Sequence, residues 1–585
     1  MRGLGMIVRA EDVPRPEHPR PDFYREDWLN LNGCWDFSFD DHELGEEEGW
    51  HLGKVEFDKR IVVPFPFQSR LSGIHDESFH DVVWYKRSFT IQEEWIGKRI
   101  LLHFGAVDYE SKVWLNGYYL GSNVGGYAPF KFDITRYLRE GENLLVLRVL
   151  DRHGDQPRGK QDSRLHPMGV HYMRVTGIWQ TVWLEAVGEA YINSVRFIPD
   201  IDNEIVEISA SLAGESEGCN LKATIYFAGV EEAEAKGLVV DGEAHLRVSI
   251  PYMKLWSPET PDLYDVELVV SKDGEVLDRV WSYFGMRKIS VKGNRILLNN
   301  EPYYLKMALD QGYYPDGLYT APSDSDLRRD VEAAKRLGLN GVRKHQLAAD
   351  PRYLYWCDKL GLLVWGEMGD WGMPLSMFER FWSEWRRIIV RDFNHPSIIV
   401  WVPFNERAEA RRDKENQRAL IEIYRRTKAL DPTRLVIDTS GYAHTETDIV
   451  DIHQYRWLKG REWIERWSKP WMEGKIPDEC LHSFAEGFKY EGQPIVISEW
   501  GGWSIEGFKP IVDRPLTSYH RVRDEFSFIS LYRDIVKVLM NEPSICGFCY
   551  TQLYDVEGEV NGFLTYDRKW KIPPEEIAKI NMGSQ

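Results

Sequence analysis

Two short apolar runs in this chain each end in a glutamate that could do chemistry. Trp401 to Glu406 reads WVPFNE, and Pro494 to Gly502 reads PIVISEWGG. A strand-like run followed by a carboxylate and then by loop residues is typical of a parallel barrel, in which the carboxyl ends of the strands meet at one mouth. Two glutamates at such a mouth indicate glycoside hydrolysis, because retaining enzymes place an acid/base and a nucleophile roughly 5 Å apart. Glu406 and Glu499 are therefore the candidate catalytic residues.

These two runs also carry a family resemblance. IIVWVPFNE, from Ile398 to Glu406, resembles the acid/base strand of glycoside hydrolase family 2, which contains β-galactosidases, β-glucuronidases and β-mannosidases. PIVISEWGG resembles the nucleophile strand of that family. The resemblance implies that Glu406 is the acid/base, that Glu499 is the nucleophile, and that Asn405 hydrogen-bonds the 2-hydroxyl of the sugar.

Composition excludes some partners. With 585 residues the chain is too long for one core, and its 43% hydrophobic and 28% charged residues are typical of a globular protein. A formal charge of −19 argues against nucleic-acid or anionic-membrane partners, which require basic patches. The N-terminus lacks a signal-like apolar segment, and no apolar run approaches membrane-spanning length. We expect a cytoplasmic, reduced protein with a carbohydrate substrate, and a homo-oligomer remains open.

Three compositions follow one another along the chain. Residues 1–187 contain short strands and the hairpin signal Asn116-Gly117, which predict a jelly-roll β-sandwich. Residues 188–287 contain alternating strands and almost no helical periodicity, which predicts an immunoglobulin-like β-sandwich. Residues 288–585 alternate strands with helices, which predicts a (β/α)₈ TIM barrel. The first domain also resembles the sugar-binding domain of the family.

Eight segments of the last domain have strand character. They are Tyr303 to Leu309, Gly341 to Lys344, Leu362 to Glu367, Ile398 to Glu406, Leu435 to Thr439, Ile449 to Tyr455, Ile495 to Glu499 and Ile545 to Gln552.

Four residues at these strand ends are candidates for the substrate site. Tyr455 resembles the sixth-strand tyrosine that hydrogen-bonds the nucleophile in this family, and Arg343 resembles the second-strand arginine that supports it. His453 is either a core histidine or a functional one. Glu367 is either a ligand of a sugar hydroxyl or a structural partner, and it is the main rival of Glu406.

Further candidates follow the strands directly. Trp500 could form a platform for the sugar or could pack at the barrel rim, as could Trp371. Gln552 and Asp310 could reach sugar hydroxyls, and a turn or cap role is the alternative for Asp310.

Two identical side chains need different environments to act as acid and nucleophile. Partial burial beside Trp401 and Phe404, or the negative charge of Glu499, would raise the pKa of Glu406. Hydrogen bonds would hold Glu499 ionised. The mechanism requires no cofactor, and the pattern specifies no metal site.

The sugar is the open question. The short three-domain layout is similar to β-glucuronidases, but those enzymes bind the uronate carboxylate with an Asn-x-Lys segment where this chain has Glu559-Val560-Asn561. An acid there would repel a uronate. We therefore expect a retaining exo-β-glycosidase acting on neutral sugars, with β-galactosides first. A β-uronidase (glucuronidase or galacturonidase) is the alternative, and a non-catalytic carbohydrate-binding protein is the second alternative.

Overall fold

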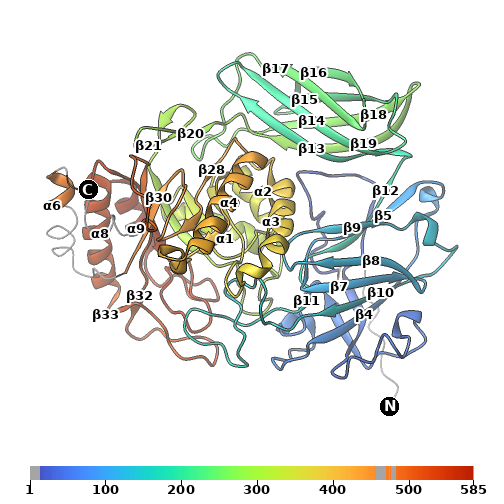
Figure 1. The fold of residues 1–585 in the computed structure, drawn as a ribbon, viewed down its shortest axis with the longest axis horizontal. Coiled ribbons are helices and arrows are strands. Elements are labelled where there is room, and N and C mark those ends of the chain that lie inside the picture. Colours follow the sequence, from blue (N-terminus) through green and yellow to red (C-terminus); the bar gives the residue numbers. More distant parts are fainter. Residues whose placement is uncertain (1–12, 456–468, 474, 476–482, 584–585) are drawn as a thin grey trace.

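The computed structural model describes residues 13–455, 469–473, 475 and 483–583. Figure 1 shows two β-sheet units beside a barrel that is covered by helices. The chain passes from the N-terminal sandwich to a second sandwich that lies above it, and then to the barrel.

The N-terminal unit is a sandwich of antiparallel sheets. Its core follows from alternation along the strands. In β2 the side chains of Trp35 and Phe37 are fully buried, while those of Cys34 and Asp36 are partly exposed. The expected hairpin is present, because Asn116 and Gly117 both have positive φ between β7 and β8. One sheet has the order β1 (Trp28–Asn30), β12 (Val182–Val187), β5 (Arg99–Phe104), β9 (Phe130–Asp133). The other has the order β3 (Lys59–Val63), β2 (Gly33–Phe39), β4 (Val82–Phe89), β10 (Asn143–Leu150), β7 (Glu110–Leu115), β8 (Tyr118–Val124), and β6 (Val107–Asp108) pairs with β11 (Gly177–Ile178).

The second unit is also an antiparallel sandwich, as an immunoglobulin-like domain requires. Its core lies between the two sheets and is almost wholly aliphatic, with Ile208, Val266 and Leu268 fully buried. The sheets have the orders β13 (Ala190–Asp200), β14 (Ile205–Gly214), β17 (Glu243–Ser249), and β16 (Val230–Leu238), β15 (Asn220–Phe227), β18 (Tyr264–Lys272), β19 (Glu275–Phe284).

The third unit contains the predicted parallel strands. Its eight-stranded sheet has the order β28 (Leu435–Val436), β26 (Ile398–Val402), β25 (Leu363–Glu367), β24 (Gly341–Lys344), β23 (Leu305–Asp310), β34 (Ile545–Thr551), β31 (Ile495–Gly501), β30 (Val450–Gln454). All neighbours in it are parallel. The predicted segment that ends at Glu406 is interrupted at Pro403, and its last part forms β27 (Phe404–Asn405), which pairs with β29 (Thr439–Ser440). This interruption is expected, because proline cannot donate to a strand ladder.

Helices cover the outside of this sheet. They are α1 (Asp324–Arg336), α2 (Pro351–Leu360), α3 (Phe378–Asp392), α4 (Lys414–Leu430), α8 (Glu525–Asn541) and α9 (Pro574–Met582), whereas the short α6 (Lys469–Met472) lies at the outer edge of the unit (Figure 1). Short strands complete the unit: β20 (Ile289–Lys292), β21 (Arg295–Leu298), β22 (Glu301–Pro302), β32 (Trp503–Ile505) and β33 (His520–Val522). None of the helices in the described part of the chain combines the length and apolarity needed to cross a membrane.

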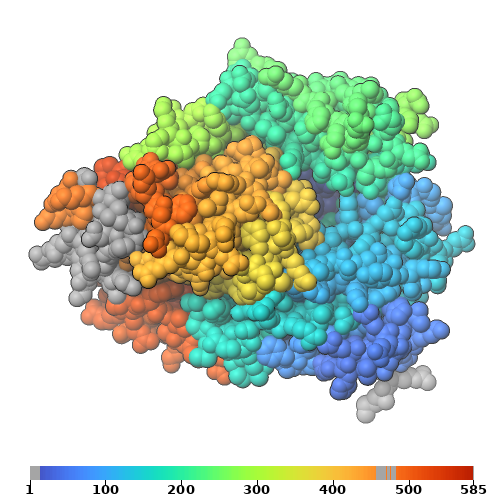
Figure 2. Space-filling view, viewed as in Figure 1, coloured from blue at the N-terminus to red at the C-terminus, as the bar shows by residue number. Residues whose placement is uncertain are grey.

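One segment of the N-terminal unit leaves its own sandwich. Residues 151–176, between β10 and β11, run along the edge of the barrel, where Figures 1 and 2 show them as a teal band against the orange and yellow units. The amide of Arg158 donates to the carbonyl of Trp371 at 3.0 Å, and Met173 donates to the Glu557 side chain at 2.7 Å. This segment therefore contributes side chains to the barrel.

Candidate active site

The two glutamates named from the sequence meet at the carboxyl ends of their strands. Glu406 follows β27 directly and has a positive φ of 56°, and Glu499 lies within β31. One oxygen of each carboxylate lies within 4.8 Å of the other. This separation belongs to the retaining type of glycosidase, in which no water fits between the carboxyl groups.

His453 lies between the two carboxylates. Its Nδ1 is 2.7 Å from Oε1 of Glu406, and its Nε2 is 3.3 Å from Oε1 of Glu499. The β30–β31 register places His453 opposite Glu499, which explains the second contact. Burial alone would lower the pKa of His453, but the charges of Glu499 and Glu406 outweigh it and raise this pKa. The structure thus places His453 in the site and not in the hydrophobic core.

The pKa of Glu406 differs from the expectation. Burial raises it, as the sequence suggested, but the hydrogen bond and charge of His453 have a larger combined effect and lower it to about 2. The predicted increase was wrong because the imidazolium was not foreseen. The lowered pKa of Glu406 and the raised pKa of His453 together favour the proton on His453, one hydrogen bond away from Glu406.

Glu499 is held on both sides. Arg343 donates from Nη1 to Oε1 at 3.2 Å, and the hydroxyl of Tyr455 donates to Oε2 at 2.6 Å. Both contacts are the ones that the family resemblance implied. Tyr519 stacks on Tyr455 with ring centroids 3.7 Å apart and fixes the phenol. Together these donors fix the position and orientation of the Glu499 carboxylate.

Arg343 is fully buried and ties a second glutamate into the site. Its Nε donates to Glu367 at 2.7 Å, and His345 lies 2.9 Å from the other oxygen of Glu367. Burial would raise the pKa of Glu367, but Arg343 and then His345 lower it to about 2. Glu367 is thus a structural partner of Arg343 and not a rival proton donor to Glu406.

Asn405 offers an unused donor to the site. Its Oδ1 accepts from Nη2 of Arg343 at 3.2 Å, which fixes the orientation of the amide. Its Nδ2 is buried and has no hydrogen-bond partner among the described residues. Buried donors are normally paired, so this one is available for an oxygen of a ligand. That use matches the role of the 2-hydroxyl contact in the family.

Trp500 packs inside the protein, so the prediction that it forms a platform for the sugar was wrong. It is 1% exposed and packs among Tyr532, Phe548 and Tyr550 behind β31. Successive side chains of a strand point to opposite faces, so the residue after Glu499 must face away from the mouth. Trp371 remains partly exposed, and its Nε1 donates to the carbonyl of Asn405 at 3.2 Å.

Asp310 and Gln552 are both enclosed. Asp310 accepts from Lys344 at 2.8 Å and from Tyr554, and Gln552 donates to Asn561 at 2.8 Å. Each keeps one buried oxygen without a partner in the described part of the chain. Both residues lie in buried hydrogen-bond networks beside β23 and β34, and a contact of either free oxygen to a sugar hydroxyl stays a prediction.

Sequence reasoning missed Lys160, which comes from the segment 151–176. Its ammonium lies 4.5 Å from the ring centroid of Trp371, and the residue is 6% exposed. Lys160 forms no ion pair with another described residue, and its charge lowers the pKa of Glu406 by less than burial, His453 and Tyr442 affect it. Its placement follows from Gly159, where an added Cβ would lie 2.2 Å from the carbonyl oxygen of Gln346. Nothing in the local sequence reveals that this loop docks there.

The acid of the Glu559-Val560-Asn561 segment is also buried. Glu559 accepts from the hydroxyl of Tyr172 and, at 3.0 Å, from Nδ2 of Asn561. Two donors therefore satisfy a carboxylate that was expected to repel a uronate.

Glu406, His453 and Glu499 could together bind a metal ion. One atom each from Glu406, His453 and Glu499 lie within 4.8 Å of one another, so this group could also hold a metal ion. Carboxylate oxygens and an imidazole nitrogen form a donor set that suits zinc and similar divalent ions.

Comparisons with known proteins identify the family of the chain. Three family models match the chain: "Glycosyl hydrolases family 2, sugar binding domain" over residues 29–186, "Glycosyl hydrolases family 2" over 190–287, and "Glycosyl hydrolases family 2, TIM barrel domain" over 289–515. The fold class predicted from the sequence is confirmed by these matches.

Curated relatives carry two different names. A β-galactosidase of Thermoanaerobacter pseudethanolicus is 30% identical over 408 residues, which cover 66% of this chain and 51% of the relative. A β-glucuronidase of Paenibacillus borealis is 24% identical over 561 residues, covering 86% of this chain and 89% of the relative. The chain spans about half the length of several curated relatives that it matches.

Solved structures show the same fold. A Bifidobacterium dentium β-glucuronidase complexed with coumarin-3-O-glucuronide superposes with a TM-score of 0.79 at 20% identity, covering 96% of this chain and 98% of that one. Because the three family models together match most of the sequence, the chain belongs to glycoside hydrolase family 2.

Proposed function

We propose that the protein is a retaining exo-β-glycosidase in which Glu406 is the acid/base and Glu499 is the nucleophile. The observation that carries this proposal is the pair of carboxylates within 4.8 Å at one barrel mouth. Relatives of both names support a glycosidase.

The contacts assign a task to each group. Glu499, oriented by Tyr455 and Arg343, attacks the anomeric carbon, and the glycosidic bond to the leaving oxygen breaks. Glu406 gives that oxygen a proton, which His453 supplies across their 2.7 Å hydrogen bond. Glu406 then takes a proton from water as the water oxygen bonds to the anomeric carbon. The bond from that carbon to Glu499 breaks, and the sugar leaves with its original configuration.

The free Nδ2 of Asn405 supports a contact to the sugar. A donor that is already buried and oriented costs little reorganisation when the transition state forms. We assign its partner as the 2-hydroxyl, where such hydrogen bonds strengthen in the transition state.

Two candidates remain for the sugar. A neutral β-galactoside, preferred from the sequence, is supported by the relatives named β-galactosidase. A β-uronide is supported by Lys160, a buried ammonium beside Trp371 without an acid partner in the described structure. A sugar carboxylate would compensate that charge, and the relatives named β-glucuronidase favour this candidate equally.

A matched pair of substrates tests both the choice of sugar and the roles of the two carboxylates. The purified protein is assayed with aryl β-galactoside and aryl β-galacturonide, which differ only at C6, and then with the gluco pair. Glu406→Gln and Glu499→Gln should each abolish turnover, and NMR of the first product should show the β-anomer. An α-anomer as first product, or undiminished turnover in either variant, would refute the assignment.

Lys160→Gln separates the two sugars. If a uronide is the substrate, this variant should lose kcat/KM for the uronide by about tenfold to a hundredfold, because a buried charge pair contributes about 1.5–3 kcal/mol. The neutral twin should be hardly affected. If the parent protein prefers the galactoside and Lys160→Gln keeps the same preference, the substrate is the neutral sugar.

A further inference from the structure

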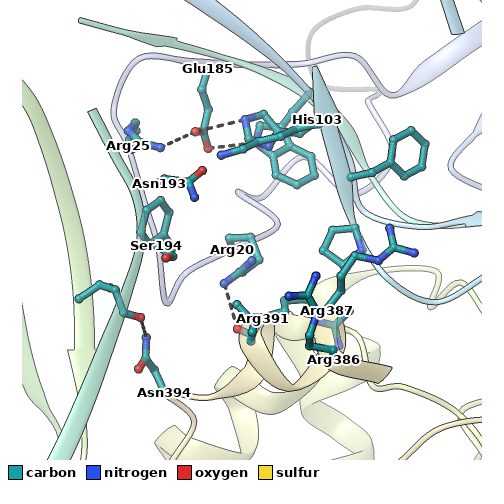
Figure 3. Close-up of a pocket in the computed structure, with 17 residues that line it drawn as sticks. Arg20, Arg25, His103, Glu185, Asn193, Ser194, Arg386, Arg387, Arg391 and Asn394 are labelled. Carbon is teal, nitrogen blue, oxygen red and sulfur yellow. Dashed lines mark hydrogen bonds and ion pairs between the residues drawn. The ribbon is translucent and has the colours of Figure 1, made fainter. Parts of the chain in front are cut away.

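A cavity lies far from the strand ends, where the three units meet. It has a volume of about 330 Å³ and is lined by β5 and β12 of the first sandwich, by the β-bulge at Ser194 in β13, and by α3 of the barrel. Figure 3 shows His103, Glu185 and Arg25 on one side of it and the arginines of α3 on the other. None of its lining residues belongs to the group around Glu406 and Glu499.

The lining of this junction cavity is strongly basic. Glu185 is the one acid among the lining residues, whereas the whole chain has a formal charge of −19. The cationic lining residues are Arg20, Arg25, Lys131, Arg386, Arg387 and Arg391. A concentration of one sign in a recess focuses the electrostatic potential there.

Three of these six cations are paired with acids, either with Glu185 in the lining or with aspartates outside it. The pairs are Arg20 with Asp22 at 2.7 Å, Arg25 with Glu185 at 2.7 Å and with Asp278 at 2.9 Å, and Arg391 with Asp392 at 2.6 Å.

The other three cations form no ion pair within the described structure. Arg387 donates only to neutral acceptors, Oδ1 of Asn123 at 2.5 Å and the carbonyl of Val124 at 2.9 Å. Arg386 lies one residue away on α3, and Lys131 faces them from β9. Arg386 repels Arg387, but the carboxylate of Glu384, which lies on the same helix, attracts Arg387 more strongly. An anion in the cavity would add to this partial compensation.

Two buried donors are also unused. Nε of Arg387 and Nη1 of Arg391 have no hydrogen-bond partner in the described structure. Lys131 and Arg386 keep exposed side chains at the cavity mouth, where desolvation by the surrounding protein, and after it Arg25, lowers the pKa of Lys131 to about 8. Unpaired buried donors and destabilised cations are the features of a site whose ligand is anionic.

The remaining wall is apolar. Phe130, Val390 and Trp183 line it, and Trp183 is stacked on His103 with ring centroids 4.7 Å apart. A bare inorganic ion would leave this wall without a partner. The cavity volume lies at the lower end of the range for small-molecule sites, roughly 300–1,000 Å³.

We propose that this junction cavity binds a phosphate monoester of a sugar-sized molecule, at a site separate from the catalytic one. Guanidinium groups match the oxygens of a phosphate in bidentate geometry, and the apolar wall accommodates the carbon skeleton. The ligand contacts all three units, so it stabilises their arrangement.

Calorimetric titration tests this with a neutral twin. Glucose 6-phosphate and glucose are titrated into the full chain at the same ionic strength, and glucose measures any binding of the sugar part at the catalytic site. We expect binding of the phosphate ester and little or none of glucose. Equal binding of both, or no binding of the ester, would overturn the proposal.

Variants locate the site. The double variant Lys131→Gln/Arg386→Gln removes two exposed cations at the cavity mouth and should weaken binding of glucose 6-phosphate about tenfold, which corresponds to about 1.4 kcal/mol for the two together. Arg418→Gln on α4 removes an exposed arginine outside the cavity and is the matched control, expected within twofold of the parent. An unchanged thermal midpoint shows that the variants are folded. Equal weakening in both would mean that only net charge matters and would refute the site.

Discussion

Replacing Arg343 by glutamine should separate its two tasks in stability and catalysis. Arg343 is fully buried, and it connects Glu367, Glu499 and Asn405 through one guanidinium. Glutamine keeps a polar group but removes the charge. Two buried carboxylates then lose their cation, and the amide of Asn405 loses its anchor.

The magnitude follows from the pKa of Glu367. Its value falls from the ordinary 4.5 to about 2 in the folded protein, and at about 1.36 kcal/mol per pH unit this corresponds to about 3 kcal/mol of stability at neutral pH. Breaking a buried ion pair typically costs about 3–5 kcal/mol. We therefore expect Arg343→Gln to lower the free energy of unfolding of the barrel by roughly that amount.

The sign of the pH dependence is fixed by the same group. Because the folded pKa of Glu367 is depressed, its contribution to stability is present above pH 4.5 and is lost as the pH falls through about 2. In Arg343→Gln that pKa should rise. The difference between parent and variant should therefore be largest near neutral pH and should shrink in acid.

Urea unfolding followed by tryptophan fluorescence measures the stability, and turnover of an aryl glycoside measures kcat/KM. Loss of one preorganised electrostatic group typically costs about 10²–10³-fold in rate. Arg434→Gln is the matched control, because Arg434 is also buried and paired, with Asp431 at 3.1 Å, at the other end of the barrel strands. It should lose stability and keep its kcat/KM once folded. A rate loss in Arg343→Gln no larger than in Arg434→Gln would refute the argument.

Three further predictions concern the carboxylate pair. Tyr455→Phe removes the 2.6 Å hydrogen bond to Glu499 and should lower kcat by about 10–100-fold, with an unchanged thermal midpoint; a parental kcat would contradict this role. His453→Gln should move the basic limb of the kcat/KM profile to lower pH, because the pair holds its proton up to the raised pKa of His453 and Glu406 alone must hold it in the variant; a limb that stays in place would exclude His453 as the proton source. Chelation by EDTA should leave turnover unchanged, because a shared proton already joins Glu406 and His453; loss of activity that zinc or another divalent ion restores would instead assign the group as a metal site.

Local sequence patterns singled out the two carboxylates, and the family resemblance singled out their supports. Glu406 and Glu499 end apolar runs, Arg343 lies on β24 and Tyr455 directly follows β30, and the order of these strands in the sheet follows chain order. The same alternation would have corrected Trp500, since a residue adjacent to Glu499 on one strand must face the opposite side.

Longer-range features could not be read in this way. The bridge by His453 depends on the register of β30 against β31, and one residue of slip would replace it by another side chain. The depressed pKa of Glu406 follows from that register. Lys160 depends on how a loop of one domain docks on another, which leaves no periodic signal.

The contact at Gly159 limits how this protein can be recombined with its relatives. An added Cβ at Gly159 would meet Gln346 and Gly369 of the barrel, and one at Gly369 would lie 2.8 Å from the backbone nitrogen of Gly159. The close packing of the loop on the barrel therefore requires glycine at both positions, which lie about 200 residues apart in the sequence. A chimera that takes its first domain from one parent and its barrel from another keeps this contact, and with it the position of Lys160, only when both parents have glycine at the two positions.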